Sequence, residues 1–187
     1  MREKILDIAI RQMKSGGYEN LNFANIAAEV GASRANIHHH FKNKEGLGIA
    51  ATESYIQGAK STMDSLLQKH EGDIKTILKM LEEHLIEIVT QSGSTNSCII
   101  SQLVHDSEAP ETLRKLAIDQ SREEEALIEA QIIKAKSNGT LDKAVNEKNL
   151  AFRVMATMFG ITQMALIEQN RGNLVKKIRG ALVSLLE

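Results

Sequence analysis

The 187-residue chain has no tryptophan, one proline, one cysteine and an aromatic content of only 3%. A single cysteine excludes an intramolecular disulfide framework and is typical of proteins in a reducing compartment. One proline in a chain that is 42% hydrophobic favours an all-α protein. Uninterrupted apolar runs of about 18 residues are absent, and the N-terminal segment differs from a secretory signal because it contains acidic residues and no long apolar core. We therefore expect a cytoplasmic protein without a membrane span.

Charge is almost balanced, with 23 Lys or Arg against 24 Asp or Glu. Such a balance argues against strong nonspecific binding of nucleic acid by the chain as a whole. The distribution is uneven, because residues 1–48 hold seven basic against five acidic side chains (+2) and residues 49–187 hold sixteen against nineteen (−3). This modest asymmetry favours the N-terminal end as the part that would face a polyanion.

Two short helices separated by a tight turn are predicted between residues 22 and 41. Asn22 can cap the first helix, whose apolar positions recur at helical spacing over residues 23–30. Gly31 can adopt the left-handed conformation that ends this helix, and Ser33 can cap the second. A short turn of this kind between two helices predicts a helix-turn-helix, whose second helix lies in the major groove of DNA.

The second of these helices carries polar residues on the side away from its apolar stripe, Ile37 and Phe41. The polar residues are Arg34, Asn36, His38, His39 and His40, and all can hydrogen-bond to base edges or phosphates. No acidic residue lies between Ser33 and Lys44. An acid-free polar face is what a surface that approaches a polyanion needs.

The stretch 22–47 resembles the DNA-binding domain of the tetracycline-repressor (TetR) family of bacterial one-component regulators. That family's usual pattern is Thr-Thr-Val-x-x-Ile-Ala-x-x-Ala-Gly-Val-Ser, followed by x-Gly-Thr-Leu-Tyr-x-His-Phe-x-Ser-Lys-Glu-x-Leu. The positions kept in register are Ile26, Ala27, Gly31, Ser33, His40, Phe41, Lys44, Glu45 and Leu47. The positions that differ include Asn22, Ala32, Ala35, Asn36 and His38, where the family has Thr, Val, Gly, Thr and Tyr.

The resemblance implies a role for each corresponding position. The residues that would approach bases are Arg34, Ala35, His38 and His39, and those that would approach phosphates are Asn22, Asn36, His40 and Lys44. We include Ser33, the cap of the second helix, in the expected DNA-binding set. Lys44 would also begin a helix whose first amides attract phosphate.

Periodic apolar residues predict about nine helices in all. The expected ranges are 2–15, 23–30, 34–41, 44–68, 74–91, 98–104, 111–137, 146–167 and 174–186, with a polar loop at 92–96. We predict an all-α chain in which a three-helix DNA-binding domain over residues 1–46 precedes a helical effector-binding and dimerisation domain over residues 47–187.

The last two predicted helices carry apolar residues on more than one face, so each must be covered on two sides. A second copy of the same pair would cover them, which predicts a homodimer through residues 147–187 or thereabouts. Two heads about 34 Å apart could then read a palindromic operator in successive major grooves of double-stranded DNA. The resemblance implies the same arrangement.

The resemblance also implies release from DNA by a small-molecule effector, and hence a repressor. We expect the effector pocket among the helices of the C-terminal part. The candidate lining residues are Tyr55, Met63, Met80, His84, Cys98, Gln102, Met155, Met158 and Phe159. Adaptable methionines favour a largely apolar effector, although methionine at helical spacing also fills cores.

The sequence lacks the common motifs of other classes of protein. The sequence has no phosphate-binding glycine loop, no Gly-x-Ser-x-Gly and no His-Glu-x-x-His, so we expect neither an enzyme nor a cofactor. No metal site is expected at His38–His40, because successive helical residues point about 100° apart. Two alternatives stay open: a repressor of the same family that senses electrophiles or oxidants through Cys98, and an architectural DNA-binding protein without an effector.

Overall fold

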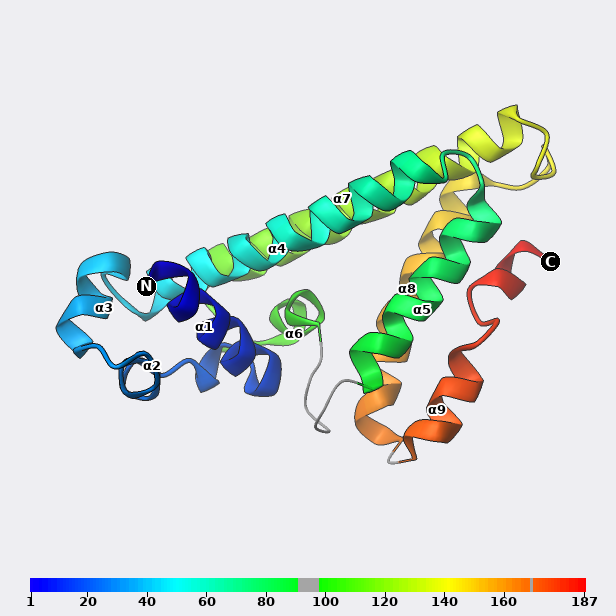
Figure 1. Ribbon diagram of the computed structural model, residues 1–187. Helices are drawn as coiled ribbons and strands as arrows, with labels where there is room; N and C mark the ends of the chain where they lie inside the picture. Colours follow the sequence, from blue (N-terminus) through cyan, green and yellow to red (C-terminus); the bar gives the residue numbers. More distant parts are fainter. Residues whose placement is uncertain (91–97, 169) are drawn as a thin grey trace. The chain divides into compact units, whose positions relative to one another are not determined.

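The computed structural model describes residues 1–90, 98–168 and 170–187, and within these ranges it is helical without strands (Figure 1). The α-helices are α1 (Arg2–Gly16), α2 (Phe23–Val30), α3 (Arg34–Phe41), α4 (Lys44–Lys69), α5 (Ile74–Thr90), α6 (Ile99–His105), α7 (Glu111–Ser137), α8 (Glu147–Ile167) and α9 (Arg171–Ile178). Two 3₁₀-helices, η1 (Tyr18–Asn20) and η2 (Val183–Leu186), complete the described elements. The predicted all-α class is confirmed, whereas the predicted loop at 92–96 lies outside the described residues.

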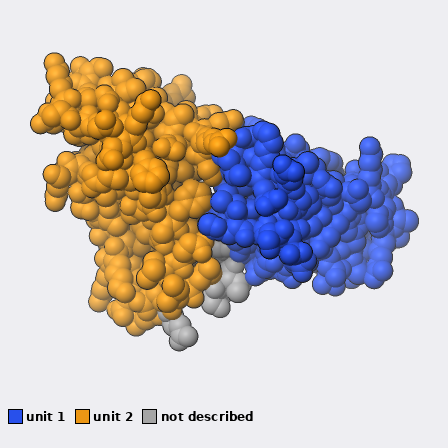
Figure 2. Space-filling view, turned by 180° about the vertical axis from the view of Figure 1, so that it is seen from behind, with its two compact units in different colours: residues 1–60, 97–120 blue, residues 61–96, 121–187 orange. Residues whose placement is uncertain are grey.

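Two compact units make up the chain, and each has its own hydrophobic core (Figure 2). Unit 1 comprises residues 1–60 and 97–120, and unit 2 comprises residues 61–96 and 121–187. The boundaries between the units therefore fall inside α4 and α7. The division of functions at residue 46 stays a prediction.

The core of unit 1 joins the three helices of the head (α1 to α3) to residues much later in the chain. Fully buried side chains of the head are Ile5, Ala9, Met13, Ile26 and Ile37. The same buried cluster contains Leu47 and Ala51 of α4 and Ile99, Ile100, Leu103, Ala109, Leu113 and Ala117 from α6 to α7. The head thus packs on α6 and on the beginning of α7.

Unit 2 is built on the apolar face of α5, which contacts both α8 and α9. Its buried cluster includes Ile77, Leu78, Leu81, Ile128, Ile132, Leu150, Val154, Leu174 and Ile178. The turn before α5 is fixed by the buried side chain of Gln131, whose Oε1 accepts a hydrogen bond of 2.9 Å from the Gly72 amide. Leu182 extends this cluster to the last residues of the chain.

The C-terminal helix is shorter than the sequence predicts. The apolar spacing of residues 174–186 favours one helix, but α9 ends at Ile178 and only η2 follows. Gly180 has φ +83°, a left-handed conformation that interrupts a helix. The buried carboxylate of Glu82 on α5 accepts hydrogen bonds from the amides of Gly180 (3.1 Å), Leu182 (2.7 Å) and Val183 (3.1 Å). Bonds to a charged acceptor thus replace the helical ones at this point.

Helix α8 keeps large apolar side chains at the surface of the chain. Phe152 is 61% exposed and Ile167 is 71% exposed, and Met164 and Leu166 are also exposed. By length and composition α8 is also the one helix in the described ranges that could cross a membrane. One such helix is weak evidence of a span, because core helices of soluble proteins pass the same test.

Candidate nucleic-acid interface

The turn between α2 and α3 has the local structure that the sequence predicts. The side-chain oxygen of Asn22 accepts hydrogen bonds from the amides of Ala24 (2.8 Å) and Asn25 (3.1 Å), which begins α2. Gly31 ends α2 in the left-handed conformation, with φ 67° and ψ 32°. The Ser33 hydroxyl accepts a hydrogen bond of 3.2 Å from the Asn36 amide and begins α3. Asn22 and Ser33 therefore act first as helix caps.

Helix α3 has one buried and one exposed side. Ile37 and Phe41 are buried in the core of unit 1. The exposed side chains are Arg34, Ala35, Asn36, His38, His39 and His40. This exposed surface contains no acidic residue, so it can approach DNA phosphates without charge repulsion.

His38 packs against its own domain. Its ring stacks on Phe23 of α2, with 4.6 Å between the ring centroids and 23° between the planes. Its Nδ1 lies 3.0 Å from the Lys42 carbonyl oxygen, and since a carbonyl oxygen only accepts, Nδ1 carries the proton. Lys42 has φ +62°, and His38 therefore also holds the unusual backbone that ends α3. The ring links α2, α3 and the following turn.

Lys44 lies at the start of α4 and contacts the turn after α1. Its Nζ donates a hydrogen bond of 3.0 Å to the Glu19 carbonyl oxygen and lies 4.7 Å from the centroid of the Tyr18 ring. Burial, and then the nearby carboxylate of Glu45, raise the pKa of the Tyr18 phenol above its ordinary value of 10.0. Because the phenol stays neutral, it does not cancel the Lys44 charge that a phosphate would meet.

Two side chains of the α6 region hold the turn between α1 and η1. Gln102 Oε1 accepts a hydrogen bond of 3.1 Å from the Gly17 amide, and its Nε2 donates one of 3.2 Å to the Lys14 carbonyl oxygen. Asp106 Oδ2 accepts a hydrogen bond of 3.1 Å from the Tyr18 amide. Gly17 has φ +69°, and a Cβ there would lie 2.9 Å from Asp106 Oδ2. This connection joins the head to α6 within unit 1.

The sequence did not indicate that Asp106 holds the turn after α1, and from the sequence we expected Gln102 to contact an effector. The Gly16-Gly17 pair marked the end of α1 but not the partner of the turn, which lies 88 residues further along the chain. Both polar ends of the Gln102 side chain bond to the backbone around the end of α1, so in this structure Gln102 has a positioning role.

The other proposed effector residues fall into three groups. In unit 1, the Tyr55 hydroxyl donates a hydrogen bond of 3.5 Å to the Cys98 sulfur. In unit 2, Met155 is buried, and Met63, Met158 and Phe159 pack against the same core. Met80, which is 41% exposed, and His84 lie on the exposed side of α5. The structure thus brings together Tyr55 with Cys98, and the three core residues of α8 with Met63 in one cluster.

Among the described residues, no group of three or more His, Cys, Asp or Glu side chains is placed to hold a metal ion. The rings of His39 and His40 meet edge to face, with their centroids 5.6 Å apart.

A capped helix-turn-helix, with an acid-free exposed second helix and a separate helical unit, defines a helix-turn-helix regulator as the class of protein. Residues 5–51 match the family model described as bacterial regulatory proteins of the tetR family. Residues 76–180 match the model of the tetracyclin repressor-like C-terminal domain. The chain belongs to the TetR family, whose members regulate transcription and are not enzymes.

Curated relatives are similar over part of their length. An uncharacterized HTH-type transcriptional regulator, YvkB of Bacillus subtilis, is 30% identical over 124 residues, which are 63% of this chain and 64% of YvkB. IcaR, the HTH-type negative transcriptional regulator of the biofilm operon icaADBC in Staphylococcus epidermidis, is 25% identical over 114 residues, 56% of this chain and 60% of IcaR. The match thus spans less than two thirds of either relative.

Solved structures share the fold over nearly their whole length. A TetR-family transcriptional regulator from Agrobacterium tumefaciens has a TM-score of 0.87 at 22% identity, with 100% of this chain and 97% of that one covered. A cysteine mutant of the TetR-family regulator CifR, complexed with 26-bp double-strand operator DNA, has a TM-score of 0.83 at 18% identity, with 97% and 95% covered. At these identities the likeness shows the fold alone.

Proposed function

We propose that the chain is a transcriptional repressor that binds a palindromic DNA operator as a homodimer and is released by a small, largely apolar effector. The observation that carries this proposal is the exposed side of α3, which is free of acidic residues and belongs to a helix-turn-helix whose two helices are capped by Asn22 and Ser33. The relatives support it, since IcaR is named as a negative regulator and CifR is named in a complex with operator DNA.

The expected contacts follow from position on α3 and α4. Arg34, at the first position of α3, and His39, exposed on that helix, are proposed to read bases in the major groove. Lys44 and the exposed side chains of Asn36 and His40 are proposed to contact phosphates. Ala35 would contribute an apolar contact to bases.

The homodimer is proposed from the exposed apolar surface of α8. Phe152 and Ile167 are more than half exposed, and large apolar surfaces of this kind mark protein contacts. Covering them with a second copy through residues 147–187 would give an isologous interface with two-fold symmetry.

Light scattering should give the mass of a dimer for the purified protein and of a monomer for Phe152→Asp. Gln68→Asp, which adds the same charge at an exposed position of α4 outside residues 147–187, is the matched control and should remain dimeric.

Release by an effector would require two states of the protein that bind DNA unequally. Gln102 and Asp106 support this part of the proposal, because they couple α6 directly to the end of α1 in the head. A ligand that moves α6 would therefore act on the DNA-binding surface through these side chains. Cys98 offers the alternative trigger, since it is the N-cap residue of α6 and its sulfur contacts Tyr55.

The test measures binding of the purified protein to the promoter DNA of its neighbouring genes at low salt, with fluorescence anisotropy for the affinity and footprinting for the site. We expect the footprint to contain two half-sites about one helical turn apart. Protection should be lost on addition of the effector, or of a thiol-reactive electrophile if Cys98 is the sensor. A monomeric protein that binds no double-stranded DNA of any sequence at low salt would overturn the proposal, and ligand-independent binding would favour the architectural alternative.

A further inference from the structure

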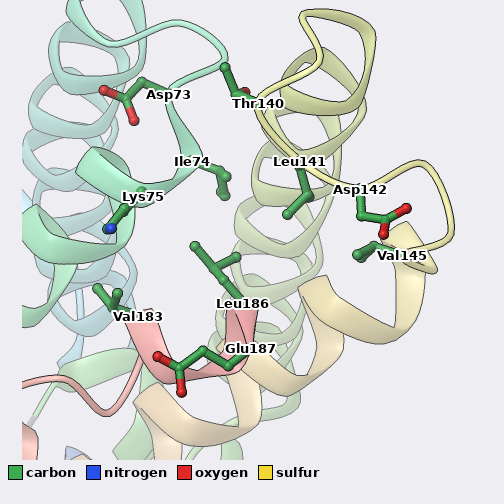
Figure 3. Close-up of a pocket in the computed structure, with 10 residues that line it drawn as sticks. All are labelled: Asp73, Ile74, Lys75, Thr140, Leu141, Asp142, Val145, Val183, Leu186 and Glu187. Carbon is green, nitrogen blue, oxygen red and sulfur yellow. The ribbon is translucent and has the colours of Figure 1, made fainter.

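A pocket of about 380 Å³ lies in unit 2, away from every residue proposed above for DNA or effector binding (Figure 3). Three segments line it: the start of α5, the connection between α7 and α8, and the last residues of the chain. The lining residues are Asp73, Ile74, Lys75, Thr140, Leu141, Asp142, Val145, Val183, Leu186 and Glu187. The volume is within the range of about 300–1,000 Å³ that small-molecule sites occupy.

Hydrogen bonds to two buried side chains, Glu82 and Gln131, and one from Thr140 hold the walls of this pocket. The buried Glu82 carboxylate fixes the amides of Leu182 and Val183, which leads η2 past the pocket. Thr140 Oγ1 donates to the Ala135 carbonyl oxygen (3.0 Å), and the neighbouring Gly72 amide is held by Gln131. A ligand would therefore enter a formed site and would have little chain to order.

The interior and the edge of the pocket differ in chemistry. Ile74, Leu141 and Leu186 point toward one another across the pocket (Figure 3). Charged side chains lie around them, and three of the four in the lining are acidic, which gives a net charge of −2 from Asp73, Asp142, Glu187 and Lys75.

Hydrogen bonding stabilises the charged form of Asp73 at the edge of the pocket, and two nearby lysines are paired with carboxylates. The hydrogen bond from Thr76 is the largest cause that lowers the pKa of Asp73 below its ordinary value of 3.8. Asp142 Oδ1 accepts a hydrogen bond of 2.8 Å from the Ala144 amide. Lys134 is paired with Glu71 and Lys136 with Glu147.

We infer that this pocket binds a small organic cation, with an apolar body among Ile74, Leu141 and Leu186 and an ammonium group at the acidic edge. The apolar interior supplies binding free energy through burial, and the acidic edge selects for positive charge. The site is separate from the proposed effector site. The inference does not depend on DNA binding.

The test uses three probes of the same size on the full chain: 3-phenylpropylamine, 3-phenylpropanol and 3-phenylpropionate. Methyl NMR titrations at millimolar concentrations should shift Leu141, Val183 and Leu186, with the amine bound about tenfold more tightly than the alcohol and the carboxylate bound weakest. No shift of these methyl groups, or equal binding of the three probes, would overturn the inference.

Variants of the lining residues separate the contribution of charge to ligand binding from that of the shape of the pocket. Asp142→Asn combined with Glu187→Gln should remove the preference for the amine over the alcohol, whereas Leu186→Trp should fill the pocket and abolish binding of both. Glu83→Gln, at an exposed acid elsewhere on α5, is the matched control and should bind the amine like the wild type. An equal loss in Glu83→Gln would show a general charge effect and contradict the site. Operator binding by the same variants, measured separately, tests the proposed function independently.

Discussion

His38 and His39 are neighbours on α3, but they have different surroundings. The family pattern implies a base contact for both, whereas in the structure His38 stacks on Phe23 and bonds to the Lys42 carbonyl oxygen. His38→Ala should therefore lower the free energy of unfolding by about 1 kcal/mol, the usual size of an aromatic pair contribution. It should also weaken binding to all DNA sequences alike. Urea unfolding and anisotropy with operator and random DNA measure the two effects.

His39→Ala serves as the comparison at the next position. It should leave the unfolding free energy unchanged and reduce the ratio of specific to random DNA binding, as expected for a residue that reads bases. Arg34→Ala should do the same. Uniform weakening by both Arg34→Ala and His39→Ala would contradict the proposed division between base and phosphate contacts.

Lys44 carries a charge that its internal contacts do not neutralise, since its partners are a carbonyl oxygen and an aromatic ring. Lys44→Gln should weaken specific and random DNA equally and reduce the slope of log K against log salt by about one unit. Lys79→Gln, an exposed lysine on α5, should leave the slope unchanged. A change of the same size in both variants would rule out a phosphate contact of Lys44.

At the scale of the element, the turn after α1 depends on α6. Gly17→Ala places a Cβ 2.9 Å from Asp106 Oδ2 and puts a side chain at φ +69°. We expect a loss of about 1–3 kcal/mol in unfolding free energy, the cost of a strained backbone. Gly139→Ala, also at positive φ but with open space around it, should cost less. Equal losses would show that the Asp106 contact adds nothing.

The break after α9 depends on one carboxylate. Glu82→Ala removes the acceptor of three amide hydrogen bonds, and a hydrogen bond to a charged group contributes a net of about 1.5–3 kcal/mol. We expect a loss on the order of 3 kcal/mol, with faster hydrogen exchange at the amides of Leu182 and Val183. Retained protection of these amides would mean that the core contacts of Leu182 hold the segment without Glu82.

Sequence reasoning placed the elements well, and the reason is local. Caps at Asn22, Ser33 and Asn146 and the left-handed Gly31 act within a few residues, so the bounds of α2, α3 and α8 follow closely from the pattern. What it missed involves distant partners. The Glu82 carboxylate accepts a hydrogen bond from the amide of Gly180, 98 residues further along the chain, where the C-terminal helix is interrupted. The Asp106 carboxylate accepts one from the amide of Tyr18, which lies 88 residues earlier. No periodicity encodes such pairs.

Three carboxylates of unit 2 make the stability of the whole molecule depend on pH. The hydrogen bond from Lys134 lowers the pKa of Glu71, that from Lys136 the pKa of Glu147 and that from Lys177 the pKa of Glu168, each below an ordinary value of 4.5. Groups with lowered pKa values stabilise the fold above their ordinary pKa, and this stability is lost as pH falls through the lowered values.

We therefore expect a shallow decline of the urea midpoint between about pH 5 and about pH 3. The decline is shallow because the lysines of two of the three ion pairs are exposed and screened, and only the Lys136–Glu147 pair is half-buried. A variant with Met in place of Lys134, Lys136 and Lys177 should show a smaller decline over the same range. An unchanged decline in that variant would assign the acid response to other groups.

Unit 1 is discontinuous in sequence, because residues 97–120 complete a core begun by residues 1–60. A hybrid regulator that exchanged only the first 60 residues between two members of the family would separate Ile5 and Ile37 from Ile99, Leu103 and Leu113, with which they share a core. Recombination that transplants operator specificity must therefore carry two pieces of the gene, or it must match the foreign head to the resident α6.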